Sequence, residues 1–447
     1  MKNLHVQEVN LRRPLYWFAQ KTRDKFAQNA IWIFVGQIFC HLLRACYFLI
    51  IARLLGAEQY GVFIGVVALV AVTAPFSSLG SVSLLIKNVS RDKSVFREYW
   101  GNALLMNTVS GCVLVTIVYI VARLILPAHV SALLILAVAI ADLVFNRMLD
   151  NSAAAFQAFD MLHITARLYV CQGLFKLLGA VALVVLVHRP SATSWAISYL
   201  LAAAASAWAG VALTSRRLGA PVLATHFIRR EAAEGLYFSG GQASETIYND
   251  IDKTMLTALA ALHGAGIYAA AYRIIDVAFV PINSLLWASY SRFFIKGNAG
   301  INSSSAYAKQ LLSRASVYSV IASLGLFVCA PLAPRALGAQ YLQTVEALRW
   351  LAPIPVLRMI HRFLGFSLAG AGFQGTRTLA QFGVAIVNVL LNLWLIPLYS
   401  WRGAGWSSLA SDGLLVVTLS LITFSLRRQQ SRTIAQAEVV PAVGELS

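Results

Sequence analysis

The strongest constraint on this chain is the recurrence of long apolar segments from one end to the other. A helix needs about 20 apolar residues to cross the hydrocarbon core of a bilayer. A helix also satisfies its own backbone hydrogen bonds in lipid, so each such segment predicts a transmembrane α-helix. The predicted spans are 31–54, 61–86, 100–126, 131–150, 166–187, 192–214, 236–260, 265–290, 311–333, 343–370, 378–399 and 405–426. The predicted fold class is an all-α polytopic membrane protein with about 12 transmembrane helices.

Composition agrees with lipid as the surrounding solvent. Only 12% of the 447 residues are charged, whereas a soluble domain has about 25%. The net charge of +18 could indicate nucleic acid. However, the basic excess lies in the loops and tails between spans and not on one face, which argues against a nucleic-acid partner.

The basic residues also predict orientation. Of the Lys and Arg between spans, 24 fall on one side of the predicted membrane and five on the other. Because cytoplasmic loops carry the excess of Lys and Arg, both termini are predicted in the cytoplasm, with tails at 1–30 and 427–447. An even number of spans is then required.

The connections on the outer side are too short to form a catalytic domain; they cover 56–60, 127–130, 188–191, 261–264, 334–342 and 400–404. The sequence also contains no nucleotide P-loop, HExxH or GxSxG motif. These observations predict a transporter and not an enzyme, with no cofactor and no metal. Any driving force would come from an ion gradient, the membrane potential or the substrate gradient.

The two halves of the chain look like repeats. The long polar connection 215–235 predicts a cytoplasmic linker between an N-lobe, 31–214, and a C-lobe, 236–426. Gly56-Ala57-x-x-Tyr60 and Gly264-Ala265-x-x-Tyr268 stand 208 residues apart, each at the first turn of its half. This predicts two six-helix lobes related by a pseudo-twofold repeat. Repeated halves around a central site are typical of alternating-access transporters.

Polar side chains inside the predicted spans form helical stripes. On span 236–260 one face carries six of them: Gln242, Glu245, Thr246, Asn249, Asp252 and Lys253. His41 and Arg44 occupy the equivalent positions in the first span after the 208-residue offset. Charges at this depth are costly and normally face a cavity or a partner. Two interpretations therefore remain: a hydrated cavity, or pairs that tie helices together, such as Arg44 with Asp252 or Asp276 with Lys253.

Further charges complete the candidate site. Arg358, His361 and Arg362 share one face of span 343–370 without an acid on it, and Lys176 has no partner nearby in sequence. Arginine binds phosphate bidentately, so these cations suit an anionic ligand, although Arg362 and His361 could instead extend to the headgroups. Candidate substrate-binding residues are Arg44, Lys176, Lys253, Arg273, Arg358, His41 and Asn249. Candidate ion-coupling or gating residues are Glu245, Asp252 and Asp276.

Three motifs in order along the chain carry a family resemblance. They are Ala52-Arg53-Leu54-Leu55-Gly56-Ala57-Glu58-Gln59-Tyr60-Gly61-Val62-Phe63, then Asp252-Lys253 followed by Tyr268, then Asn388, Asn392, Ile396-Pro397-Leu398-Tyr399 and Gly403-Ala404. This pattern resembles the Wzx-type oligosaccharide flippases of the multidrug/oligosaccharidyl-lipid/polysaccharide exporter (MOP) superfamily. The chain departs from the pattern at Ser400, where a glycine often stands, and at Gly405-Trp406-Ser407-Ser408, which replaces a run of small residues.

The resemblance implies two lobes around a cavity that opens alternately to each side. The implied cargo is an oligosaccharide linked to a polyprenyl (undecaprenyl-type) diphosphate, moved to the periplasmic leaflet for O-antigen, capsule or exopolysaccharide synthesis. Membrane lipids and a polysaccharide polymerase or other glycan-assembly proteins are the implied partners. The alternatives are a drug/cation antiporter of the same superfamily, a membrane glycan polymerase or ligase, and a non-transporting scaffold.

Overall fold

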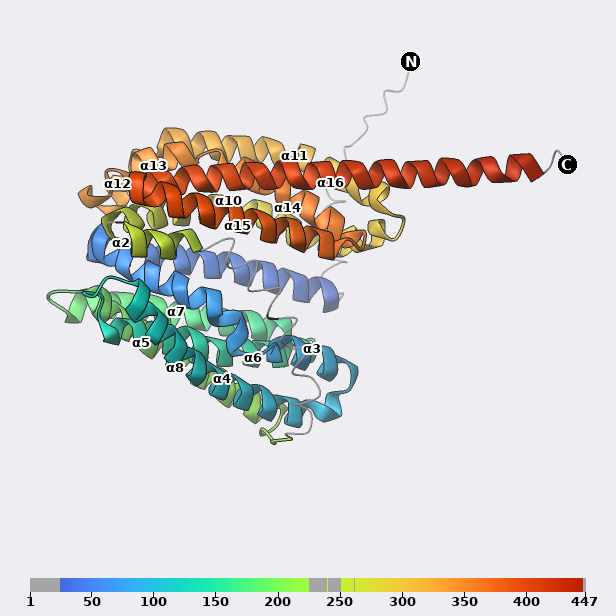
Figure 1. Cartoon of the computed structure of the whole chain (residues 1–447). Helices are drawn as coiled ribbons and strands as arrows, with labels where there is room; N and C mark the ends of the chain where they lie inside the picture. The colour runs from blue at the N-terminus through green and yellow to red at the C-terminus, as the bar shows by residue number, and fades with distance from the viewer. Residues whose placement is uncertain (1–24, 225–238, 240–250, 261, 445–447) are drawn as a thin grey trace, which may run out of the picture.

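The computed structural model describes residues 25–224, 239, 251–260 and 262–444, and within these ranges every regular element is a helix (Figure 1). Nine helices in the described part of the chain are long and apolar enough to cross a membrane. The first of these segments, Phe39–Ser90, contains a kink and folds back on itself. The prediction of an all-α polytopic membrane protein is confirmed.

The N-lobe begins with one long bent helix. Helix α2 (Lys25–Ser77) includes the first predicted span and most of the second, and it changes direction at Gly56, which has φ 73°. Glycine adopts this left-handed φ without the steric penalty that a Cβ would impose. The second predicted span ends at Ser77 and not near 86, because the polar residues that follow form a separate amphipathic helix, α3 (Ser81–Arg91). The lobe continues with α4 (Phe96–Ile125), α5 (Ala132–Ile140), α6 (Asn146–Ala158), α7 (Leu162–Leu186) and α8 (Ala192–Leu218).

The C-lobe starts, in the described residues, with a helix at 251–259 and the long α10 (Leu262–Gly297). The prediction of one continuous span at 343–370 is wrong, because this segment breaks near Pro353 into two helices. Proline has no backbone N–H and clashes with the preceding turn, so it interrupts a helix here. The remaining elements are α11 (Ile301–Cys329), α12 (Leu332–Leu337), α13 (Thr344–Leu351), α14 (Ile354–Gly370), α15 (Gln374–Tyr399) and α16 (Trp401–Gly444). Helix α16 continues well past 426 and projects beyond the bundle (Figure 1).

The two lobes meet along α2 and α10. Figure 1 shows the blue-to-green helices α2–α8 on one side and the yellow-to-red helices α10–α16 on the other, and α2 packs against both α7 and α10. At the kinked end of α2 the backbones approach closely. A Cβ on Gly266 would lie 1.7 Å from the carbonyl oxygen of Ala57, and one on Gly61 would lie 2.2 Å from that of Leu262. We call these four residues the glycine seam; it joins the Gly-Ala-x-x-Tyr turns of the two halves.

One hydrogen bond ties the lobes together close to the seam. The Tyr341 hydroxyl, in the short 3-10 turn Ala339–Tyr341, donates to the carbonyl oxygen of Ala52 on α2 at 3.0 Å. Both groups are buried. The lobe interface is therefore closed at this end by direct backbone contact and a buried hydrogen bond.

Candidate functional site

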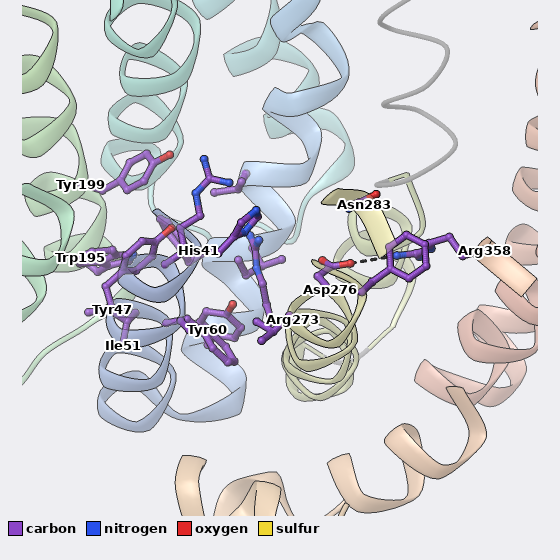
Figure 2. A pocket seen from close by; sticks show the side chains of 18 of the residues that line it. His41, Tyr47, Ile51, Tyr60, Trp195, Tyr199, Arg273, Asp276, Asn283 and Arg358 are labelled. Atoms are coloured by element: carbon purple, nitrogen blue, oxygen red, sulfur yellow. Dashed lines mark hydrogen bonds and ion pairs between the residues drawn. The ribbon is translucent and has the colours of Figure 1, made fainter. Parts of the chain in front are cut away.

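A cavity of about 280 Å³ lies between the lobes (Figure 2). Its walls come from α2 and α8 of the N-lobe and from α10 and α14 of the C-lobe. Five of the predicted site residues line it: His41, Arg44, Arg273, Asp276 and Arg358. The tertiary structure thus brings together side chains that are more than 300 positions apart in sequence.

The C-lobe wall of the cavity is basic, and its arginines are held in place. Arg358 Nη1 lies 3.1 Å from Asp276 Oδ1 (Figure 2). The Arg358 guanidinium also stands 5.5 Å from the ring centre of Tyr272, within the range of a cation–π contact. Arg362 donates a hydrogen bond to Asn283 Oδ1 at 2.8 Å.

Arg273 extends from α10 toward the opposite lobe. Its guanidinium interacts electrostatically with the hydroxyl of Tyr60 on α2, and Figure 2 shows the two side chains together. Arg44 comes from α2 and is largely exposed to the cavity. The described lining of the cavity therefore includes four arginines and one aspartate.

The N-lobe wall is aromatic, which the sequence analysis did not predict. Trp195 packs with its ring centre 6.1 Å from that of Tyr47 and 6.0 Å from that of Phe63. Phe63 also meets Tyr199 edge-on at 5.7 Å. One signal was available in the sequence: Trp195 and Tyr199 are four residues apart, and Tyr47 is three after Arg44, so each pair shares a helical face.

A second cavity of about 160 Å³ adjoins the first and shares Arg273 and Asp276 with it. Lys253 lines this second cavity, with its Nζ 5.4 Å from the ring centre of Tyr272. Lys253 is thus the sixth predicted site residue to face this region. Among their described residues, the two cavities together are lined by five Arg or Lys side chains and by one acid, Asp276.

Lys176 and Asp142 instead belong to a polar network inside the N-lobe. The Tyr199 hydroxyl donates to Asp142 Oδ1 at 2.7 Å and accepts from Lys176 Nζ at 3.2 Å. Asn146 donates to Asp142 Oδ1 at 2.6 Å and accepts from Gln172 at 2.7 Å. Asp142 lies in a π-helical turn, Ala141–Phe145, between α5 and α6. Through Tyr199 this network reaches the cavity wall, although Lys176 is not among the described lining residues.

Asp252 is likewise buried within its own lobe. Its Oδ2 accepts hydrogen bonds from the Tyr268 hydroxyl and, at 3.4 Å, from Ser408 on α16. Asp252 thus contacts Tyr268 and Ser408, and Asp276 contacts Arg358. The pairings considered from sequence were Arg44 with Asp252 and Asp276 with Lys253, and they stay predictions. Of the stripe on span 236–260, Gln242, Glu245, Thr246 and Asn249 lie outside the described residues.

The basic face of α14 is neutralised in part, contrary to the expectation of a cluster without acids. Arg358 pairs with Asp276 from α10, and His361 Nε2 lies 3.6 Å from Asp412 Oδ1 on α16. A face that lacks acids in its own sequence can acquire them from neighbouring helices. For Arg358 the partner comes from 82 residues away.

The chain matches a known protein family. The family described as "Polysaccharide biosynthesis protein" matches residues 26–294, more than half of the sequence. The chain belongs to this family. Its many apolar helices make it a multi-pass membrane protein. A search of curated protein sequences finds no significant match.

Solved structures of the same fold are distant in sequence. The lipid II flippase MurJ in an inward closed conformation has a TM-score of 0.70 at 14% identity, over 89% of this chain and 87% of that one. An inward-facing MATE-family multidrug resistance transporter has a TM-score of 0.68 at 14% identity, over 87% of this chain and 96% of that one. A MOP-superfamily transporter from Pyrococcus furiosus has a TM-score of 0.62 at 12% identity, over 95% of this chain and 100% of that one. That protein is described as having a binding pocket of reverse polarity. These similarities establish that the chain shares the fold of these transporters.

Proposed function

We propose that this protein is a flippase that moves a polyprenyl-diphosphate-linked oligosaccharide from the cytoplasmic to the periplasmic leaflet by alternating access. The observation that carries the proposal is the basic cavity between the lobes, whose described lining includes four arginines and one aspartate. A diphosphate cannot leave water without cationic or hydrogen-bonding partners. Arginine guanidinium groups provide both, in a fork that matches phosphate oxygens.

The proposed path separates the parts of the substrate by polarity. The polyprenyl tail stays in the bilayer, the diphosphate contacts the arginines, and the sugars occupy the hydrated cavity. The substrate would be an intermediate of surface polysaccharide synthesis, such as O-antigen, capsule or exopolysaccharide. The setting we propose is the bacterial inner membrane, with both termini in the cytoplasm and a polysaccharide polymerase as a functional neighbour.

The main alternative is a drug/cation antiporter with the same fold. An organic cation would need acids and exposed aromatic faces in the cavity. Asp276 is the one acid among the described lining residues, and it is paired with Arg358. Most of the aromatic wall is closely packed, and Trp195 is only 1% exposed. The charge of the cavity therefore favours an anionic cargo.

The direct test is leaflet-resolved labelling of the lipid-linked oligosaccharide in a strain from which the gene is deleted. The sugar is expected to accumulate on the cytoplasmic side and to return to the periplasmic side when the gene is restored. A parallel assay in proteoliposomes compares lipid-linked sugar with organic cations as cargo. Unchanged appearance of the sugar on the outer leaflet in the deletion strain would contradict the proposal.

The glycine seam gives a second test, because alternating access requires the closed end of the interface to form and open. Gly266→Ala places a Cβ 1.7 Å from the Ala57 carbonyl oxygen. Overpacking of this kind costs about 1–3 kcal/mol. The variant is expected to disfavour the closed seam and to slow outward labelling several-fold.

The matched control for the seam is Gly383→Ala on α15, where a Cβ would meet nothing within 4 Å. This variant should transport like the wild type. Equal labelling rates for Gly266→Ala and Gly383→Ala would show that the seam has no part in the transport cycle.

A further inference from the structure

We infer that, in the empty cavity, the Asp276 carboxylate occupies the position at which a phosphate group of the substrate binds, and that the substrate displaces it. This inference rests on the proposed function and assigns Asp276 a role within the same site. Asp276 would act as an internal substitute for the substrate's negative charge.

The first argument is charge. Asp276 is shared by both cavities and is the acid among their described lining residues. The described lining of the same two cavities includes four arginines, from α2, α10 and α14, and Lys253. Like charges brought together at this depth repel each other, and a membrane-embedded charge is stable only with a partner or water. Asp276 supplies a counter-charge at this wall through its pair with Arg358.

The second argument is the asymmetry of the pair with Arg358. The Arg358 side chain is 13% exposed, whereas the Asp276 side chain is 47% exposed. Arg358 is also held between the rings of Tyr272 and Phe279, at 5.5 and 6.0 Å from their centres. The cation is therefore fixed in the wall, while the acid lies on the cavity side, where an arriving anion can replace it.

The third argument is chemical similarity. A carboxylate and a phosphate present oxygens at a spacing that one guanidinium binds in the same way. A diphosphate carries more negative charge than a carboxylate and can reach several arginines at once. Because the Asp276 side of the pair is open to water, water partly screens the pair, so the exchange is favourable when substrate enters.

The displaced carboxylate also has a second partner. Arg273 lies three residues before Asp276 on α10, one helical turn away, and the two groups already interact electrostatically. Asp276 can therefore turn toward Arg273 or toward water when Arg358 takes the substrate. After release, it returns to Arg358, which allows the empty protein to close without a trapped anion.

The test uses the full-length protein purified in detergent and inorganic pyrophosphate as the probe. Binding is measured by calorimetry for the wild type and for Asp276→Asn, which removes the charge and keeps the shape. With the competitor gone, Asp276→Asn is expected to bind pyrophosphate roughly tenfold more tightly. Asp276→Glu, which restores the carboxylate, should return toward wild-type affinity.

The matched control is Glu346→Gln. Glu346 pairs with Arg402 at 2.9 Å in an exposed bridge away from the cavity, so its loss should leave pyrophosphate affinity unchanged. A second readout is outward labelling of lipid-linked sugar, which Asp276→Asn is expected to slow, because substrate leaves less readily. Tighter binding with slower transport is a combination that simple unfolding does not produce.

The possible outcomes are distinct. If the wild type binds pyrophosphate and Asp276→Asn binds it equally or more weakly, the inference is overturned and the proposed flippase function stands. If neither protein binds pyrophosphate, the inference is also overturned, and the leaflet assay alone decides the function. If Asp276→Asn binds more tightly but the deletion strain labels normally, the inference stands and the proposed function fails.

Discussion

Arg273→Ala is expected to lower outward labelling of the lipid-linked oligosaccharide by roughly 10- to 100-fold. Arg273 lines both cavities and extends from α10 toward Tyr60 on α2, so its guanidinium stands at the lobe interface. Loss of one hydrogen bond to a charged group costs about 1.5–3 kcal/mol, and each 1.4 kcal/mol corresponds to about a tenfold change. The rate of labelling in a complemented deletion strain measures the effect.

Two further variants make this result specific to the cavity. Arg273→Lys retains the positive charge but loses the planar fork, so an intermediate rate is expected. Arg402→Ala removes an arginine of similar chemistry from the exposed pair with Glu346, and it should label like the wild type. Wild-type labelling by Arg273→Ala in membranes that contain normal amounts of the protein would contradict anion binding by this residue.

Asp142→Asn is expected to lower the free energy of unfolding by about 1–3 kcal/mol, the range for leaving buried hydrogen-bonding groups unsatisfied. Asp142 accepts from Tyr199 and Asn146, and through Tyr199 it is connected to Lys176, which is 9% exposed. Without the carboxylate, Lys176 remains buried near Tyr199 with its charge uncompensated. Thermal or denaturant unfolding of the purified protein in detergent measures the loss.

A second substitution tests the cause. Lys176→Met in the Asp142→Asn background removes the remaining charge, so the double variant should recover most of the lost stability. Glu58→Gln, at an exposed position of α2, is the control for loss of a negative charge and should leave stability unchanged. Equal stability of Asp142→Asn and the wild type would indicate that Lys176 is compensated by other groups.

The charges inside the membrane show how far sequence patterns reach. Helical periodicity predicted that His41, Arg44, Arg273, Asp276 and Arg358 are functional candidates, and all five line the cavity. It could not predict the pair of Arg358 with Asp276, because an interhelical contact depends on how α10 and α14 pack. Lys176 and Asp252 are also charged residues inside apolar spans, but they contact tyrosines within their own lobes. The sequence pattern could not distinguish them from the cavity residues for the same reason.

The aromatic wall illustrates a different limit. Tyr47, Phe63 and Trp195 are ordinary apolar residues within apolar spans, and hydropathy does not distinguish a ring that faces lipid from one that faces a cavity. Only the packing of α2 against α8 brings these rings together. The family match and the solved structures do not provide this detail either, because they show the fold at low identity.

The sequence by itself determined that this chain spans a bilayer as a bundle of α-helices. In lipid the backbone must satisfy its hydrogen bonds internally, and long apolar segments do so as helices. The sequence also marked the positions where charge is placed at a cost inside that bundle. The tertiary structure decided which of those charges meet across the lobe interface, which are tied to tyrosines, and which acid stands among the arginines. The physical reason is that solvent preference is a property of each segment, whereas electrostatic partnership depends on distances between segments that only packing sets.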